Sequence, residues 1–297
     1  MYDMNTKSLT RGAMMCAIYG ALLLINQQTA LTIETSASWI FVFPMLIYAA
    51  TSTTYMSGLV AIAMALMSFL FGSFTTWFYS WCSIIMGFIY GIGISKKWKN
   101  MTNFILCFIL SLISTALTIT VWATLFGMDL TEDFAMVHKF IPGVSFEVFV
   151  SLFIILMGLL QALCIHLVSI MICMRMKIEI RPLKPIYSIQ NPTWIGAVSL
   201  LIWFIYLFGQ NMVECSQNVR NIFQFIWFMD CFVLDYFGVI FLLDTCIRKN
   251  KRKMSFFVIF GAFIPVINFI WMFLGEVDSL LQMREAIREL EIKNETV

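Results

Sequence analysis

The chain has 297 residues, of which 61% are hydrophobic and only 12% are charged, and its formal net charge is +2. Its mean hydropathy is +0.87. A water-soluble chain of this length does not need so much apolar surface to fill a core, so the composition excludes a soluble globular protein and indicates an integral membrane protein.

Nine apolar runs, each closed by charged or turn-forming residues, follow one another along the chain. A helix needs about 20 apolar residues to cross the hydrocarbon layer of a membrane. We therefore predict an all-α, polytopic membrane helix bundle with about nine transmembrane helices. The second run is short and predicts a tilted or partly buried helix. The runs are 9–25, 39–50, 56–71, 76–94, 103–127, 146–173, 194–210, 222–246 and 255–275.

Basic residues gather at alternate ends of these runs. If every run spans, 14 of the 19 lysines and arginines lie on one side. Short cytoplasmic loops carry such an excess, so the pattern predicts a cell-membrane protein with a cytoplasmic N-terminus. An odd number of spans places the C-terminus outside, unless Pro265 makes the last run kinked or re-entrant. The 14 residues are Lys7, Arg11, Lys96, Lys97, Lys99, Arg175, Lys177, Arg181, Lys184 and the five basic residues of 248–253.

The first run carries a strip of small residues. Ala13, Ala17 and Ala21 recur every four residues and so share one face of a helix. Small side chains let helix backbones approach closely inside a membrane, where lipid provides no hydrophobic drive for association. Two interpretations follow: the strip packs within this chain, or it docks another subunit.

Three segments carry a resemblance to a known family. The segment 9–19 (LTRGAMMCAIY) resembles the first helix of the substrate-binding S components of energy-coupling factor (ECF) transporters, and especially of their relatives, the YybS-like predicted membrane proteins of Gram-positive bacteria. The segment 87–91 (GFIYG), followed by Lys96 and Lys97, resembles the end of the family's fourth helix. The segment 275–278 (GEVD), with Arg284 downstream, is similar to the family's closing motif.

This resemblance implies a division of the chain and a set of partners. Residues 1–174 would form an S-component-like unit of six helices, and residues 194–275 would add three helices that ordinary S components lack. In S components the alanine strip slides against a transmembrane coupling subunit driven by paired ATPases, a role that falls here to Ala13, Ala17 and Ala21. The ligand would be a small molecule of unknown identity.

Ionisable and polar side chains inside the apolar runs are candidate ligand-binding groups, because such residues are costly within a membrane. Asp230 and Asp235 lie in the eighth run, and Asp235 is close to its midpoint. Five residues on a helix correspond to about 140° of rotation, so the two aspartates are expected on different faces. Gln161 and His166 lie in the sixth run. The alternative is that these groups only hydrogen-bond to neighbouring helices.

Several chemistries are not expected. The chain has two histidines, His138 and His166, and lacks a His-Glu-x-x-His motif, so we predict no zinc-protease site and no metal site. The eight cysteines show no Cys-x-x-Cys spacing, and we interpret them as small packing residues. There is no phosphate-binding Gly-x-x-x-x-Gly-Lys-Ser/Thr loop. We predict a protein that is not an enzyme, has no catalytic residues, binds no cofactor or nucleic acid, and needs a partner for any use of ATP.

Two segments outside the runs complete the organisation. Residues 175–193 form a cytoplasmic linker stiffened by prolines. Residues 276–297 are expected to hold an amphipathic helix, because Val277, Leu280 and Leu281 recur at helical spacing. The sequence leaves two functions open. One is an S-component-type transport or substrate-binding protein in the lipid bilayer, and the other is a non-transport scaffold or sensor that recruits partners through its helices and C-terminus.

Overall fold

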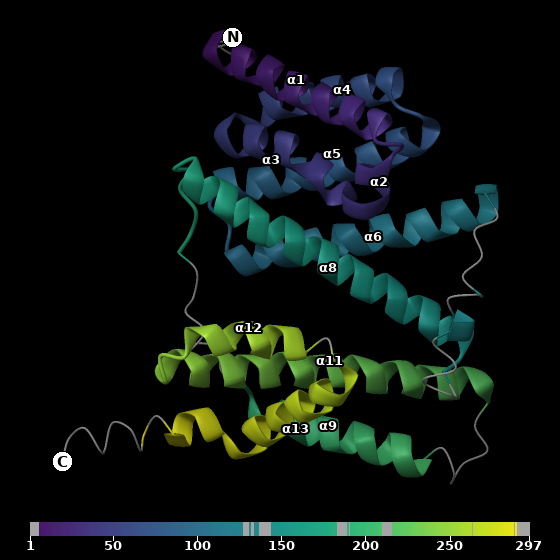
Figure 1. Ribbon diagram of the computed structural model, residues 1–297, viewed down its shortest axis with the longest axis vertical. Helices are drawn as coiled ribbons and strands as arrows, with labels where there is room; N and C mark the ends of the chain where they lie inside the picture. The colour runs from purple at the N-terminus through teal and green to yellow at the C-terminus, as the bar shows by residue number, and fades with distance from the viewer. Residues whose placement is uncertain are drawn as a thin grey trace. The chain divides into compact units, whose positions relative to one another are not determined.

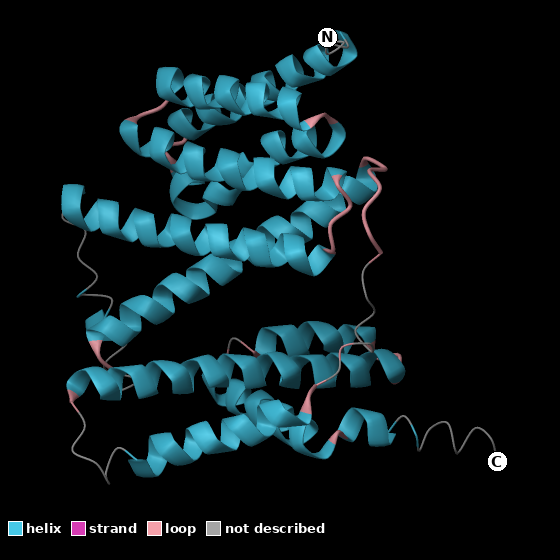
Figure 2. Ribbon diagram, turned by 180° about the vertical axis from the view of Figure 1, so that it is seen from behind, coloured by secondary structure: helices cyan, strands magenta, loops and turns pink. Residues whose placement is uncertain are grey.

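In the computed structural model, the described part of the chain consists mainly of α-helices (Figure 1). The structure describes residues 6–126, 131, 134–136, 144–182, 189, 191–209, 216–262, 264–287 and 289, apart from a few side chains within helices. No strand occurs among these residues (Figure 2). The all-α prediction is therefore confirmed for the part of the chain that is described.

Within the described residues, seven helices are long and apolar enough to cross a membrane by their length and composition. They correspond to the first six predicted runs and the eighth. The seventh run forms only a shorter apolar helix, Thr193–Phe208, and the ninth run is broken, so the expected count of nine spans is not reproduced. The seven are Thr6–Gln28, Thr32–Thr51, Thr54–Phe71, Phe74–Ser95, Asn100–Val121, Phe146–Arg175 and Gln217–Arg248.

The chain divides into two compact units. Unit 1 comprises Met1–Asp129 and Phe153–Leu183, and unit 2 comprises Leu130–Leu152 and Lys184–Val297. The finer division into four segments made from the sequence stays a prediction. Unit 1 contains α1 (Thr6–Gln28), α2 (Thr32–Ala37), η1 (Ser38–Phe41), α3 (Val42–Thr51), α4 (Thr54–Phe71), α5 (Phe74–Ser95), α6 (Asn100–Phe126) and most of α8 (Phe146–Arg175). Unit 2 contains the start of α8, then α9 (Thr193–Phe204), η3 (Ile205–Gly209), α11 (Gln217–Arg248), α12 (Arg252–Gly261) and α13 (Pro265–Leu281).

Helix α3 is the most enclosed helix of unit 1, and α5 packs closely on it. A Cβ atom at Gly87 would lie 2.5 Å from the carbonyl oxygen of Val42, and one at Gly91 would lie 2.6 Å from that of Leu46. Glycine at both positions lets the two backbones touch, which explains the Gly-x-x-x-Gly spacing. Eight of the ten residues of α3 are buried, which confirms that the second run is at least partly shielded.

Two basic segments meet at one end of unit 1. Lys97 Nζ lies 2.5 Å from Glu179 Oε2, and Asn100 Nδ2 donates to the carbonyl oxygen of Arg181 at 2.9 Å. The hydrogen bond and the positive charge of Lys97 lower the pKa of the exposed Glu179 carboxyl. The segments after α5 and after α8 therefore lie together, as expected if both stand on one side of a membrane.

Helices α11 and α13 cross in unit 2 at a pair of glycines. A Cβ atom at Gly238 would lie 1.9 Å from the carbonyl oxygen of Trp271, and one at Gly275 would lie 2.1 Å from that of Leu234. Backbone atoms cannot move aside in the way that a flexible side chain can. The crossing therefore requires glycine at both positions.

The ninth run is interrupted, as Pro265 suggested. Helix α12 ends at Gly261, and α13 begins with Pro265 in its first turn, where the missing N–H of proline is not needed. Trp271 Nε1 donates to the carbonyl oxygen of Val258 at 3.0 Å, and Asn268 Nδ2 donates to that of Ala262 at 2.9 Å. These bonds fold the two short helices against each other in place of one span.

The predicted C-terminal amphipathic helix is also interrupted. Its first residues, from Glu276 onward, continue α13, which ends at Leu281. Gln282 has φ 49° and ψ 42°, a left-handed conformation that stops the helix. Residues 283–287 are helical again, and most of the remaining segment lies outside the described residues.

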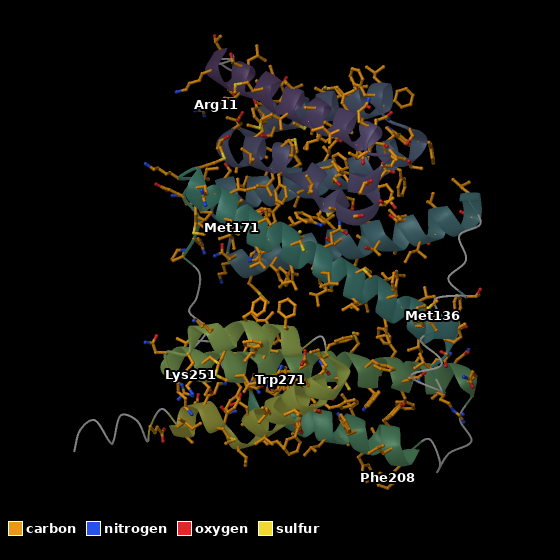
Figure 3. All side chains as sticks on the ribbon, in the orientation of Figure 1. Arg11, Met136, Met171, Phe208, Lys251 and Trp271 are labelled. Carbon is orange, nitrogen blue, oxygen red and sulfur yellow. The ribbon has the colours of Figure 1, made fainter. Side chains whose placement is uncertain are left out.

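Large apolar side chains cover the outward faces of both units. Met171 of α8 is 58% exposed and Phe208 of η3 is 54% exposed, and both are labelled in Figure 3. An aqueous surface rarely carries so many exposed apolar groups in contiguous patches, whereas a lipid-facing surface does. The side-chain distribution agrees with the membrane composition of the helices.

Candidate functional site

The four predicted ligand-binding residues are divided between the two units. Gln161 and His166 lie on the part of α8 that belongs to unit 1, and Asp230 and Asp235 lie on α11 of unit 2. Each pair is described by itself below.

His166 is a hydrogen-bonded packing residue. Its Nδ1 atom lies 2.7 Å from the hydroxyl oxygen of Tyr90, and its ring packs edge-on against Phe104 with a centroid distance of 5.3 Å. Gln161 is half-buried five residues earlier on the same helix. The histidine thus contacts neighbouring helices through a hydrogen bond and a ring contact, and its role in ligand binding stays a prediction.

Replacing Tyr90 by phenylalanine should lower the free energy of unfolding by about 1 kcal/mol, because the substitution removes the partner of the His166 nitrogen. Thermal unfolding of the purified protein in detergent would measure the change. Tyr236→Phe is a suitable control, since the Tyr236 side chain is exposed. Equal stability of the two variants would show that the Tyr90 hydrogen bond contributes nothing.

Asp230 and Asp235 have different surroundings, as their spacing predicted. Asp230 is 8% exposed, and the hydroxyl group of Ser199 on α9 donates to its Oδ2 atom at 2.7 Å. Asp235 is half-buried, and its Oδ1 atom is enclosed without a hydrogen-bond partner among the described residues. Asp230 thus belongs to a packed helix contact, whereas Asp235 lies on a different face of α11.

A buried polar cluster in unit 1 was not predicted. Glu34 of α2 is 4% exposed, and its Oε2 atom accepts hydrogen bonds from Asn26 Nδ2 at 3.1 Å and from Thr76 Oγ1 at 2.6 Å. The backbone N–H of Glu34 donates to Asn26 Oδ1 at 3.0 Å. Glu34 falls between two apolar runs and therefore looked like a loop residue. The cluster depends on contacts between α1, α2 and α5 that composition does not reveal.

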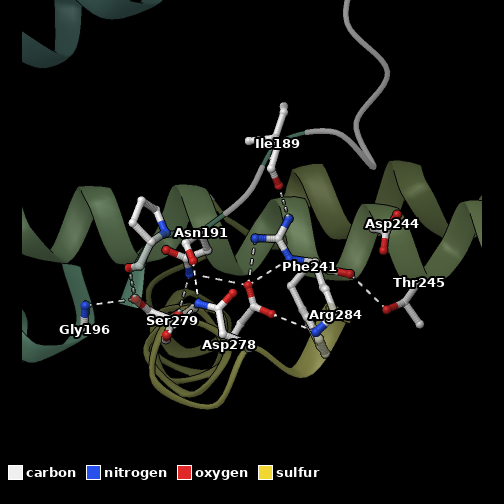
Figure 4. Close-up of polar contacts among 12 residues, drawn as sticks. Ile189, Asn191, Gly196, Phe241, Asp244, Thr245, Asp278, Ser279 and Arg284 are labelled. Atoms are coloured by element: carbon white, nitrogen blue, oxygen red, sulfur yellow. Dashed lines mark hydrogen bonds and ion pairs between the residues drawn. The ribbon is translucent and has the colours of Figure 1, made fainter. Parts of the chain in front are cut away.

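A second unpredicted cluster closes the end of α13 (Figure 4). Arg284 Nε donates to Asp278 Oδ2 at 2.8 Å, and both side chains are almost completely buried. Arg284 Nη1 also donates to the carbonyl oxygen of Ile189 at 2.9 Å, and Asn191 Nδ2 donates to that of Gly275 at 3.2 Å. We call Asp278, Arg284 and Asn191 the clamp.

Ser279 and Gln282 extend the clamp to the start of α9. The hydroxyl group of Ser279 donates to the carbonyl oxygen of Pro192 at 2.8 Å and accepts from the N–H of Gly196 at 2.8 Å. Gln282 Nε2 donates to the carbonyl oxygen of Asn191 at 2.6 Å. In the sequence, only Asp278 and Arg284 of this group stood out, through the resemblance of 275–278 and Arg284 to a family motif. In the structure these two residues help to join the end of α13 to the segment before α9.

The alanine strip of α1 faces outward. Ala13, Ala17 and Ala21 are exposed, whereas a Cβ atom at Gly12 would meet Val60 and Tyr48 at 2.9 and 3.2 Å. The helix therefore packs on α3 and α4 through its glycine side. The strip therefore does not pack against the other described helices of unit 1, and docking of another subunit stays a prediction.

No family model, no curated protein and no solved structure matches the chain. Within the described ranges, no group of three or more His, Cys, Asp and Glu residues is arranged to hold a metal ion. The part of the chain that the structure describes is all-helical, and its seven long apolar helices are suited to a multi-pass membrane protein.

Proposed function

We propose that the chain is a membrane transport or substrate-binding protein of the ECF S-component type, located in the cell membrane with its N-terminus in the cytoplasm. Unit 1 binds a small molecule, and α1 docks on a transmembrane coupling subunit that is driven by paired ATPases. Gln161 and His166 in unit 1, with Asp230 and Asp235 in unit 2, are the proposed ligand-binding residues.

The exposed alanine face of α1 is the observation that carries this proposal. Ala13, Ala17 and Ala21 lie on the outer side of a helix whose inner side is already packed. A face of small side chains permits a second helix to approach closely and to slide, because no large side chain interlocks with it. Larger exposed side chains, among them Met14, Ile18 and Leu24, flank the strip on α1, so the three alanines form a narrow stripe of small residues on the outward side of the helix.

The polar residues of unit 1 support the substrate-binding part. A small-molecule site is mostly apolar and contains a few polar groups that fix the orientation of the ligand. Unit 1 provides such groups in Glu34 with its two partners, and in Gln161 and His166, inside an otherwise apolar helical bundle.

Purification from native membranes in a mild detergent, followed by mass spectrometry of bound subunits and small molecules, tests the proposal. The wild-type protein should retain a coupling subunit and a stoichiometric ligand. Ala17→Trp should abolish retention of the subunit without changing the thermal unfolding of the protein, because Ala17 is exposed and a tryptophan there fills the space that a docked helix needs.

Ile109→Trp is the matched control, since Ile109 is an exposed residue of α6 and the same indole there faces outward from another helix. It should retain the subunit at the wild-type level. Equal retention by the two variants would contradict docking through α1. If neither a ligand nor a coupling subunit accompanies the wild-type protein, the scaffold or sensor function replaces the proposed one.

A further inference from the structure

Two carboxylates of unit 2 converge on one serine. Ser199 of α9 donates its hydroxyl hydrogen to Asp230 of α11 at 2.7 Å, and Glu276 of α13 lies beside the same serine and within electrostatic reach of Asp230. Helix α13 reaches this point because Gly196, nearly one turn before Ser199, leaves room for Leu280. We call Asp230 and Glu276 the carboxyl pair.

Glu276 has no partner for its charge. Both of its carboxylate oxygens are enclosed, and neither accepts a hydrogen bond from a described residue. Ser199 has a single hydroxyl hydrogen, which Asp230 already takes. A carboxylate without donors or cations in a buried setting is strongly unfavourable, and a second carboxylate beside it makes the charge still less tolerable.

Among the described side chains, the other ionisable groups around the carboxyl pair do not supply a cation. Helix α9 and η3 contribute Tyr206, and α11 contributes Cys231 and Asp235, none of which is basic. On α13, Asp278 is already paired with Arg284, so that cation is taken. Lys253 of α12 is exposed at the start of its helix, and Arg248 of α11 is paired with Asp244.

The neighbouring polar groups favour a proton over a metal ion. The indole nitrogens of Trp203 and Trp227 are enclosed, have no hydrogen-bond partner in the described part of the chain, and belong to rings whose centroids are 5.6 Å apart. Trp227 is three residues before Asp230, so both lie on one side of α11. An indole N–H can only donate, so it serves a carboxylate oxygen and cannot complete the oxygen shell of a cation.

We propose that Asp230 and Glu276 bind one proton between them, which makes unit 2 a proton-binding element of the protein. In the protonated pair one carboxyl is neutral and the other is charged, so the pair bears a single negative charge, and Ser199 already donates to Asp230. Release of this proton leaves two adjacent negative charges among α9, α11 and α13. Proton release is therefore linked to separation of these helices, and this property does not depend on the S-component-type function.

Infrared difference spectroscopy of the full-length protein in detergent, between neutral and alkaline pH, tests the proposal. The wild-type protein should lose the carbonyl stretch of a protonated carboxylic acid at alkaline pH, and Glu276→Gln and Asp230→Asn should lack this signal. Asp244→Asn should keep it, because that substitution removes a carboxylate of the same helix that already has an arginine partner. Absence of the signal in the wild type, or its persistence in both single variants, would overturn the proposal.

Two further outcomes decide the result. If Glu276→Gln does not fold, Asp230→Asn decides: loss of the infrared signal in that variant supports the shared proton, and persistence of the signal overturns the proposal. The infrared measurement is also made in a buffer in which choline replaces sodium. If the carboxylic acid signal is absent in sodium and present in choline, a sodium ion neutralises the pair and the proposal is wrong.

Discussion

Gly238→Ala is expected to lower the free energy of unfolding by about 3 kcal/mol or more, which is the upper end for overpacking in a closely packed interior. The added Cβ atom would lie 1.9 Å from the carbonyl oxygen of Trp271, and that oxygen belongs to a helix backbone. Helices α11 and α13 would have to separate, and the contacts of unit 2 would be lost with them. Thermal or denaturant unfolding in detergent would measure the loss.

Gly58→Ala is the control for this substitution. A Cβ atom at Gly58 of α4 would meet no atom within 4 Å, so alanine there should stabilise the helix by about 1 kcal/mol through its higher helix propensity. Gly275→Ala should behave like Gly238→Ala, since its Cβ atom would lie 2.1 Å from the carbonyl oxygen of Leu234. If alanine at positions 238 and 58 has the same effect, the two helix backbones do not touch as described.

Arg284→Met is expected to lower the free energy of unfolding by about 3–5 kcal/mol, because it leaves the buried Asp278 carboxylate without its cation. The substitution also removes the donor to the carbonyl oxygen of Ile189. Combining Arg284→Met with Asp278→Leu should recover part of the loss, since a buried ion pair replaced by apolar residues is often close to neutral. The same unfolding measurement applies to both variants.

The pair of Lys97 and Glu179 provides the comparison, because both side chains are largely exposed. Lys97→Met should leave the unfolding transition unchanged, since water and salt screen an exposed ion pair. If Arg284→Met also leaves the unfolding transition unchanged, the clamp does not hold the end of α13 to the linker.

Most of the helices were predictable because lipid imposes a simple rule on composition. A segment that crosses the hydrocarbon layer must be apolar over about 20 residues, and the first, third to sixth and eighth runs satisfy this rule. The break at Pro265 was predictable because proline lacks a backbone N–H and clashes with the preceding turn. The start of the second span was not, because Thr32–Ala37 contains polar residues that become helical and are held by Asn26 and Thr76.

The site residues were harder to predict than the helices. An ionisable residue in an apolar run, such as Asp230, is visible in the sequence, but its partner Ser199 comes from another helix and has no local signal. Glu276 lies one residue beyond the last predicted run and was assigned to the amphipathic C-terminal helix. Its burial follows from the glycine crossing of α11 and α13, which is a long-range property of the fold.

The two connections at the ends of α4 are very short. Only Ser52 and Thr53 join α3 to α4, and only Gly72 and Ser73 join α4 to α5. A protease or an antibody binds a stretch of extended backbone, and turns of two residues provide almost none. Residues 32–95 should therefore survive limited digestion as one fragment. Epitope tags and labelling sites for mapping the orientation of the protein therefore belong in the longer segments at 96–99 and 176–182.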